Sequence, residues 1–135
     1  DQPQVISDRN EMVRSMDPQV VPGIFVFATV SQIESVPDDV GVYSTVSEAE
    51  GLSVVIAYDD AHRFGLTEPV KLGWITLTVN SSLEGVGLTA AVSGVLAEHG
   101  VACNVIAGHH HDHLLVPVDE VDAAIQLLKT LADQR

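Results

Sequence analysis

The N-terminal half of the chain carries three apolar segments with the pattern of β-strands. All three are rich in β-branched residues, and the first is continuously apolar, which is typical of a buried strand. These segments are residues 24–30, 40–46 and 52–58. Glu50 and Gly51 predict a hairpin turn between the last two strands. A short helix is predicted over residues 8–16, ahead of the strands.

The C-terminal half has a clearer pattern of strands and helices. Apolar positions at helical spacing over residues 88–99 predict a helix that ends at Gly100. A second helix is predicted to begin with Asp119 as its cap, and its apolar stripe runs from Val121 to Ala132. Three strands are expected beside these helices, at residues 74–79, 101–107 and 114–118.

The order strand, helix, strand, strand, helix predicts an α+β fold of the ferredoxin-like type. In that fold the helices cover one face of an antiparallel sheet. A βαββαβ module ends on a further strand, which the C-terminal half lacks. We therefore expect strands of the N-terminal half to complete its sheet.

The charge of the chain limits the partners that it can bind. With 19 acidic and 6 basic residues, the formal net charge is -13. This charge repels phosphate backbones and anionic lipid surfaces, so neither nucleic acid nor a membrane is an expected partner. A cationic or zwitterionic small molecule suits such a surface better than an anion.

The single cysteine and the N-terminal sequence favour a reducing compartment. Cys103 has no partner for an internal disulfide, and no basic segment followed by an apolar run begins the sequence. The cytoplasm is therefore the expected location.

A dense histidine cluster offers candidate metal ligands. On an extended strand His109, His111 and His113 would point to one face, whereas His110 and Asp112 would point to the other. The cluster therefore predicts either a metal site built from the first three side chains or a solvated hairpin tip.

A glycine-bearing loop precedes the predicted helix at residue 88. Glycines at a helix N-terminus expose backbone N–H groups that can hold a carboxylate. Ser81 and Ser82 could add hydroxyl donors, and Glu84 could bind an ammonium group. This pattern suits a free amino acid, although Gly85 and Gly87 could instead serve only close packing and a helix cap.

Enzymatic chemistry has little support in the sequence. Cys103 lies in an apolar strand, where cysteines are usually inert. Paired acids such as Asp38 and Asp39 fall in loops and are expected to be solvated. We expect neither catalysis nor a cofactor.

Five ordered motifs resemble the ACT domain family. They are PGIFVFATV at residue 22, EAEGLSVV at 48, SSLEGVGLTAAV at 81, NVIA at 104 and HDHLLVP at 111. Over about residues 10–133, the chain resembles small bacterial proteins that consist of two ACT domains. The resemblance implies tandem ferredoxin-like βαββαβ modules, with residues 1–66 as an N-terminal ACT-like module carrying a leading helix and residues 67–135 as a C-terminal ACT module.

The resemblance also implies a function and a ligand site. Similarity to the ACT pairs of an animal cytosolic arginine sensor implies a non-enzymatic regulatory or sensor protein that binds an amino acid at an interface between ACT domains. We expect it to form a homo-oligomer, a dimer, through sheet edges or helix faces. Carried over by position, the implied ligand-binding residues are Ser82, Glu84, Gly85, Val86, Gly87, Leu88, Asn104, Ile106 and Asp112. The competing hypotheses are a metal-binding protein that uses the cluster at His109–His113 and an interaction module with a vestigial pocket.

Overall fold

The computed structural model describes residues 5–6 and 8–134. These residues form two compact units. The first unit comprises the described residues up to Pro22 together with those from Gly73 onward, and the second is Gly23–Leu72. The first four residues of the predicted N-terminal module lie outside the described part of the chain. The predicted boundary between residues 66 and 67 stays a prediction.

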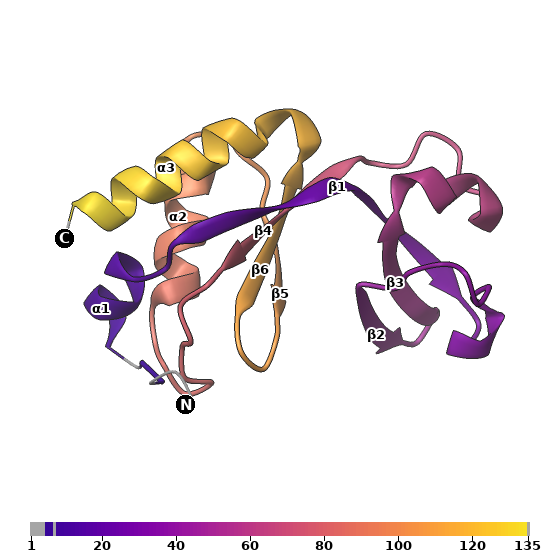
Figure 1. The fold of residues 1–135 in the computed structure, drawn as a ribbon, viewed down its shortest axis with the longest axis horizontal. Helices are drawn as coiled ribbons and strands as arrows, with labels where there is room; N and C mark the ends of the chain where they lie inside the picture. The colour runs from indigo at the N-terminus through magenta and orange to yellow at the C-terminus, as the bar shows by residue number, and fades with distance from the viewer. Residues whose placement is uncertain (1–4, 7, 135) are drawn as a thin grey trace. The chain divides into compact units, whose positions relative to one another are not determined.

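The first unit contains the sheet of a ferredoxin-like module (Figure 1). Its strands, neighbours in this order, are the start of β1 (Pro18–Val30) up to Pro22, β4 (Leu72–Leu77) from Gly73 onward, β6 (Asp112–Pro117) and β5 (Asn104–Ala107). Strand β1 thus lies next to β4, where the C-terminal half lacks a strand of its own. The expectation that the N-terminal half completes this sheet is confirmed.

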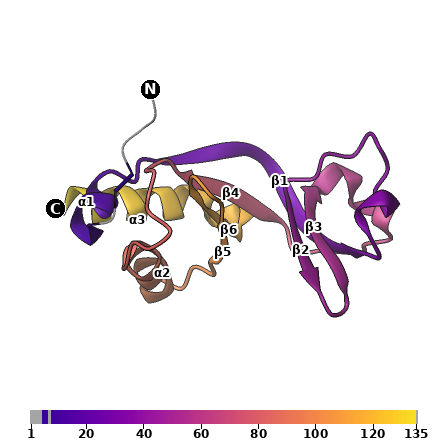
Figure 2. The same ribbon diagram turned by 90° about the horizontal axis from the view of Figure 1, so that it is seen from below.

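Three helices pack together in the first unit (Figures 1 and 2). They are α1 (Arg9–Arg14), α2 (Leu88–Glu98) and α3 (Val121–Asp133). Because side chains alternate along a strand, β4 and β6 present one apolar row each to these helices. The shared core includes Ile75, Leu77, Leu114, Val116, Met12, Val92, Leu96 and Leu128. The helices therefore cover one face of the sheet, as predicted. None of the helices in the described residues is long and apolar enough to cross a membrane.

The ends of the helices follow from local chemistry, with one correction. The carboxylate of Asp8 caps α1 by accepting a hydrogen bond from the Glu11 N–H at 3.0 Å. At the end of α2, Gly100 has a φ of +74°, and it allows the chain to close the helix as predicted. The prediction that Asp119 caps α3 is wrong. Asp119 lies inside a 3₁₀ turn, and Glu120 occupies the N-cap position without a side-chain hydrogen bond.

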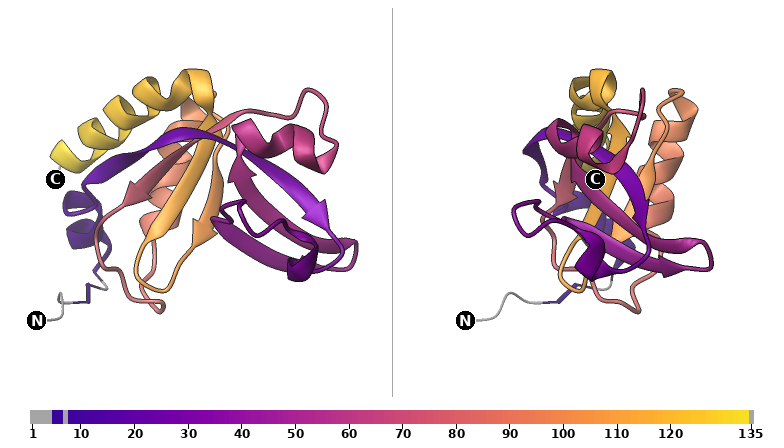
Figure 3. Two further views of the ribbon diagram at one scale, coloured as in Figure 1. Left: turned by 45° about the vertical axis from the view of Figure 1, so that its right-hand side comes forward. Right: turned by 90° about the vertical axis from the view of Figure 1, so that its right-hand side faces the viewer.

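The second unit is a three-stranded antiparallel sheet with little helix (Figure 3). Strand β3 (Gly51–Ala57) lies between β1 and β2 (Ser44–Glu48), and Val26 of β1 pairs with Ile56 of β3. In this unit two short 3₁₀ helices, Ile33–Ser35 and Tyr58–Phe64, hold the positions that full helices have in a ferredoxin-like module.

Strand β2 begins later than the apolar pattern predicts. The predicted strand covered residues 40–46, but the Val40 N–H donates to the Pro37 carbonyl in a turn at 3.0 Å. Val40 is still buried in the core of the second unit. The apolar residues at this position belong to a turn whose side chains pack into the core. A buried turn and a buried strand can have the same apolar pattern, so the pattern alone predicted a strand.

Candidate functional site

The loop between β4 and α2 is held by the N-terminal segment and by its own hydrogen bonds. The Ile6 N–H donates to the Asn80 carbonyl at 2.9 Å, and the Ser82 N–H donates to the Ile6 carbonyl at 2.8 Å. The Ser82 hydroxyl accepts from the Glu84 N–H at 3.0 Å, and the Ser82 carbonyl accepts from the Gly85 N–H at 2.9 Å. These bonds give the loop a defined path toward the helix.

Gly87 starts α2 in a conformation that suits glycine. It is the N-cap of the helix with a φ of +108°, in the left-handed region that other residues avoid. A Cβ at this position would lie 2.6 Å from Cδ of Arg9, so the Arg9 side chain lies directly against this turn. The first N–H groups of a helix have no partner within it, and they carry partial positive charge. The start of α2 is thus chemically able to hold an anion.

The β5–β6 hairpin brings Asp112 to the same cavity as the start of α2. The Gly108 N–H closes the tip of this hairpin by donating to the His111 carbonyl at 2.9 Å. Asp112 pairs with Ala107 in the hairpin register. Burial raises the pKa of the Asp112 carboxyl, while His113 and His111 act in the opposite direction. This half-buried carboxylate is therefore partly removed from water, and a cationic partner would stabilise its charged form.

These elements enclose a cavity of about 240 Å³. It is smaller than the roughly 300–1,000 Å³ of sites for drug-sized ligands, so it suits a molecule of a few non-hydrogen atoms. Its lining comes from α1, the loop before α2, the start of α2 and the β5–β6 hairpin. The lining residues are Met12, Ser81, Ser82, Leu83, Gly85, Gly87, Leu88, Thr89, Ala107, Gly108 and Asp112.

Five of the nine predicted ligand-binding residues are gathered around this cavity: Ser82, Gly85, Gly87, Leu88 and Asp112. They come from segments more than 20 residues apart in the sequence. The start of α2 offers donors and Asp112 offers an acceptor, so the cavity lining contains groups of opposite polarity. A zwitterion matches this arrangement.

The other four predicted residues do not line the cavity. Val86 is 80% exposed and the Glu84 side chain is also exposed. Asn104 and Ile106 alternate with Ala107 along β5, so they lie on the opposite face of the sheet from this cavity-lining residue. Glu84 thus does not supply the acidic side of the cavity.

Sequence reasoning missed the contribution of the leading helix. Met12 lines the cavity from α1, and its Sδ would lie 3.2 Å from a Cβ placed on Gly85. No local pattern in residues 8–16 indicates this long-range contact. Ala107 and Gly108 were also missed. Ala107 could have been predicted, because it is the residue that pairs with Asp112 in the hairpin.

The structure does not support the metal site predicted at His109, His111 and His113. Among residues 5–6 and 8–134, no group of three or more His, Cys, Asp or Glu side chains is placed to hold a metal ion. The His113 Nδ1 atom lies 2.9 Å from the Thr76 hydroxyl, whereas the His111 Nδ1–H donates to the Val79 carbonyl at 3.2 Å. The His113 ring is therefore held at Thr76 of β4, and the His111 ring is held at Val79, just after β4. The two rings do not converge on a common point.

Comparisons with known proteins agree with the fold. Two family models, both described as ACT domains, match residues 70–130 and 6–71. A crystal structure from Vibrio cholerae, of a protein of unknown function described as a possible transport protein, is 39% identical with a TM-score of 0.80. The match covers 91% of this chain and 94% of that chain.

The chain belongs to the ACT domain family. More distant structures share the fold alone. An Agrobacterium tumefaciens protein is 20% identical with a TM-score of 0.62, over 85% of this chain and 87% of that one. The ligand-free regulatory subunit of aspartate kinase from Thermus thermophilus is 9% identical with a TM-score of 0.62, over 87% and 97%. A search of curated proteins returned no match to the chain.

ACT domains typically bind amino acids in regulatory proteins, and they commonly form oligomers. In this ACT protein the motifs that carry the family resemblance include the loop before α2 and the β5–β6 hairpin. The cavity lies between these two segments.

Proposed function

We propose that this ACT protein is a cytoplasmic, non-catalytic regulatory protein that binds a free amino acid in the cavity at the start of α2. The observation that carries the proposal is that Asp112 and the N-terminus of α2 line the same cavity of about 240 Å³. The carboxylate of the ligand binds the exposed N–H groups near Gly87, and its ammonium group binds Asp112.

The charges near the cavity support a zwitterion over an anion. Asp112 lines the cavity, and the chain as a whole carries a formal charge of -13. A free anion would meet repulsion from both. The Arg9 side chain against Gly87 adds positive charge only at the helix end, where the ligand carboxylate is expected.

A regulatory rather than catalytic role agrees with the state of the lone thiol. Burial raises the pKa of Cys103, which lowers the fraction of reactive thiolate near neutral pH. Cys103 also does not line the cavity.

A thermal-shift screen of the twenty amino acids tests the proposal. A ligand present at one hundred times its Kd stabilises the folded state by about 2.7 kcal/mol, so a true ligand raises the unfolding temperature by several degrees. For each hit, the amine without the carboxylate and the N-acetylated amino acid serve as matched controls. Both controls should lose the shift. If none of the twenty amino acids gives a shift at millimolar concentration, the proposal is wrong.

We also propose that the protein is a homodimer. Strand β5 is an edge strand of the sheet, so its backbone can pair with a second copy. Its Val105 side chain is 37% exposed. Sedimentation analysis of Val105→Lys should show monomers where the wild type forms dimers. Ala97→Lys, an exposed change on α2, should leave the dimer intact.

A further inference from the structure

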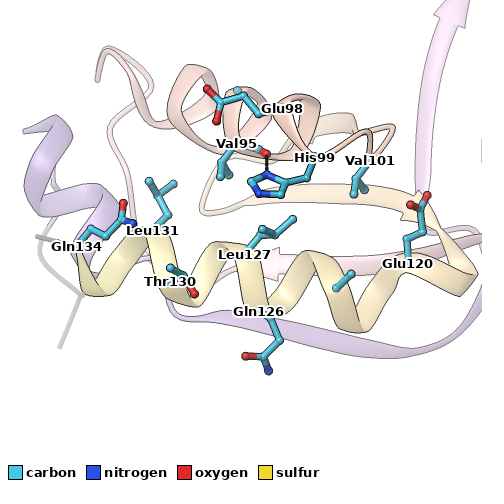
Figure 4. Close-up of a pocket in the computed structure, with 12 residues that line it drawn as sticks. Val95, Glu98, His99, Val101, Glu120, Gln126, Leu127, Thr130, Leu131 and Gln134 are labelled. Carbon is cyan, nitrogen blue, oxygen red and sulfur yellow. Dashed lines mark hydrogen bonds between the residues drawn. The ribbon is translucent and has the colours of Figure 1, made fainter.

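The outer side of the helical layer holds a larger cavity than the proposed amino-acid site. A groove of about 810 Å³ runs between α2 and α3 and is called the α2–α3 groove here. Figure 4 shows Val95 of α2 and His99, the C-cap residue of α2, facing Leu127 and Leu131 of α3. None of these four residues lines the cavity at the start of α2, so the groove is a separate feature.

The groove has the length and spacing of a helix-binding surface. Its lining on α3 extends from Glu120 to Gln134, which at 1.5 Å per residue is about 20 Å. Lining residues recur there at helical spacing, at positions 120, 123, 126, 127, 130, 131 and 134. A small molecule does not span this length, whereas a partner helix of about 14 residues does.

Gly94, in the middle of α2, lines the groove and leaves space there because it has no side chain. A helix-interior glycine costs about 1 kcal/mol relative to alanine, and the backbone of Gly94 does not need glycine because its φ is not positive. A Cβ at this position would meet nothing within 4 Å, so close packing within the described structure does not require glycine either. The space is available to a side chain from outside the chain.

The groove is lined by acidic side chains and by no lysine or arginine. Its lining includes Glu98 and Glu120 but no lysine or arginine. The His99 ring donates from Nδ1 to the Val95 carbonyl at 2.9 Å, so its Nε2 atom is not used in this bond. A second copy packed groove against groove would bring no lysine or arginine to pair with Glu98 and Glu120, because the lining holds none. The groove therefore complements hydrogen-bond donors and positive charge.

We propose that the α2–α3 groove binds an amphipathic helix of a partner protein, with apolar side chains on one face and lysine or arginine residues flanking them. The apolar residues pack over Gly94, Val95 and Leu127, and the basic residues pair with Glu98 and Glu120. This binding site is independent of the amino-acid cavity.

The test uses a synthetic helical peptide and the full chain. The probe is a fluorescent 14-residue peptide with leucines at i, i+3, i+4 and i+7 spacing and lysines elsewhere, and its matched control has glutamates in place of the lysines. By anisotropy at 150 mM NaCl, the lysine peptide should saturate at one per chain and bind at least tenfold more tightly than the glutamate peptide.

Two matched pairs of variants locate the binding. Ala123 lines the groove, whereas Ala97 is an exposed α2 residue outside its lining. Ala123→Arg should weaken lysine-peptide binding at least tenfold, and Ala97→Arg should change it less than twofold. For charge, Glu98→Gln should weaken binding several-fold more than Asp133→Asn, at an exposed position that does not line the groove. Circular dichroism melting checks that the variants fold.

Three results would overturn the proposal. The first is equal binding of the lysine peptide to the two arginine variants, or no saturable binding to the wild type. The second is a homodimer that dissociates in Ala123→Arg but not in Ala97→Arg, which would make a second copy the occupant. The third is an apolar dye, 8-anilinonaphthalene-1-sulfonate, that binds in an Ala123-dependent manner while the peptide does not, which would indicate a small-molecule site.

Discussion

His113 makes the stability of the first unit depend on pH. The Trp74 indole N–H donates to the His113 Nδ1 atom at 3.2 Å and also to the Thr76 hydroxyl oxygen at 3.2 Å, and this oxygen lies 2.9 Å from the same Nδ1 atom. An indole N–H can only donate, so Nδ1 must be unprotonated for this bond to exist. Burial lowers the pKa of His113, the charge of His111 lowers it further, and Asp112 opposes both.

The sign of the effect follows from this lowered pKa. As pH falls below about 6.5, the unfolded chain takes up a proton at residue 113 before the folded chain does. The contribution of His113 to the free energy of unfolding is therefore complete above pH 6.5. It decreases as pH falls toward the pKa of the folded state. Asp112 acts at lower pH with the opposite sign, because its raised pKa makes the folded state bind a proton first as pH falls toward 3.8.

The size of the effect comes from one hydrogen bond. Its net contribution is about 1 kcal/mol, which corresponds to about 4 °C in unfolding temperature for a domain of this size. His113→Leu removes this acceptor and should lose at most about this amount at pH 8, because the indole N–H keeps the Thr76 oxygen as an acceptor. His113→Asn places an acceptor oxygen near the position of Nδ1 and does not titrate, so it should retain most of the stability at pH 8.

The assay is urea unfolding between pH 5 and pH 8, followed by the fluorescence of Trp74, the single tryptophan of the chain. The free energy of unfolding of the wild type should decrease more between pH 7.5 and pH 5 than that of His113→Asn. Equal pH dependence of the wild type and His113→Asn would show that the Trp74 contact does not require a neutral His113.

Three further predictions concern packing and reactivity. A Cβ on Gly73 would clash with Cγ2 of Val121. Gly73→Ala should therefore destabilise the fold by about 1–3 kcal/mol. Adding Val121→Ala should restore part of this loss in a double-mutant cycle measured by urea unfolding. Leu128→Ala should cost about 2–5 kcal/mol, because this side chain is fully buried between α3 and the sheet; a loss below 1 kcal/mol in thermal or urea unfolding would contradict this packing. Cys103 should react with iodoacetamide at pH 8 more slowly in the folded protein than in urea, because burial raises its pKa, and equal mass-spectrometric labelling rates would show that the thiol is exposed.

The sequence was most informative where local chemistry determines the structure. The stop of α2 at Gly100 and the apolar stripe of α3 follow from residues within one or two turns of each other. Asp119 shows the limit of this reasoning, since a good capping residue was displaced by a 3₁₀ turn before the helix. Val40 shows another, because a buried turn residue has the same apolar pattern as a strand residue.

The candidate site was only partly predictable for a different reason. Ser82, Gly85 and Gly87 lie in one continuous loop, so the family motif located them together. The placement of Asn104 and Ile106 depends on which face of β5 meets the cavity, and a shift of one residue reverses the face. Met12 reaches the cavity from the leading helix through tertiary packing, which no local pattern records.

The most direct test of the amino-acid site is a calorimetric titration of the best amino acid from the thermal-shift screen into the wild type, Asp112→Asn and Asp122→Asn. Asp122 is an exposed acid on α3 outside the cavity, so it is a matched control. Asp112→Asn removes the charge that pairs with the ligand ammonium group. It should weaken binding at least tenfold, or about 1.4 kcal/mol, whereas Asp122→Asn should leave the Kd unchanged. Equal affinity of all three proteins for the amino acid would show that the ligand binds elsewhere.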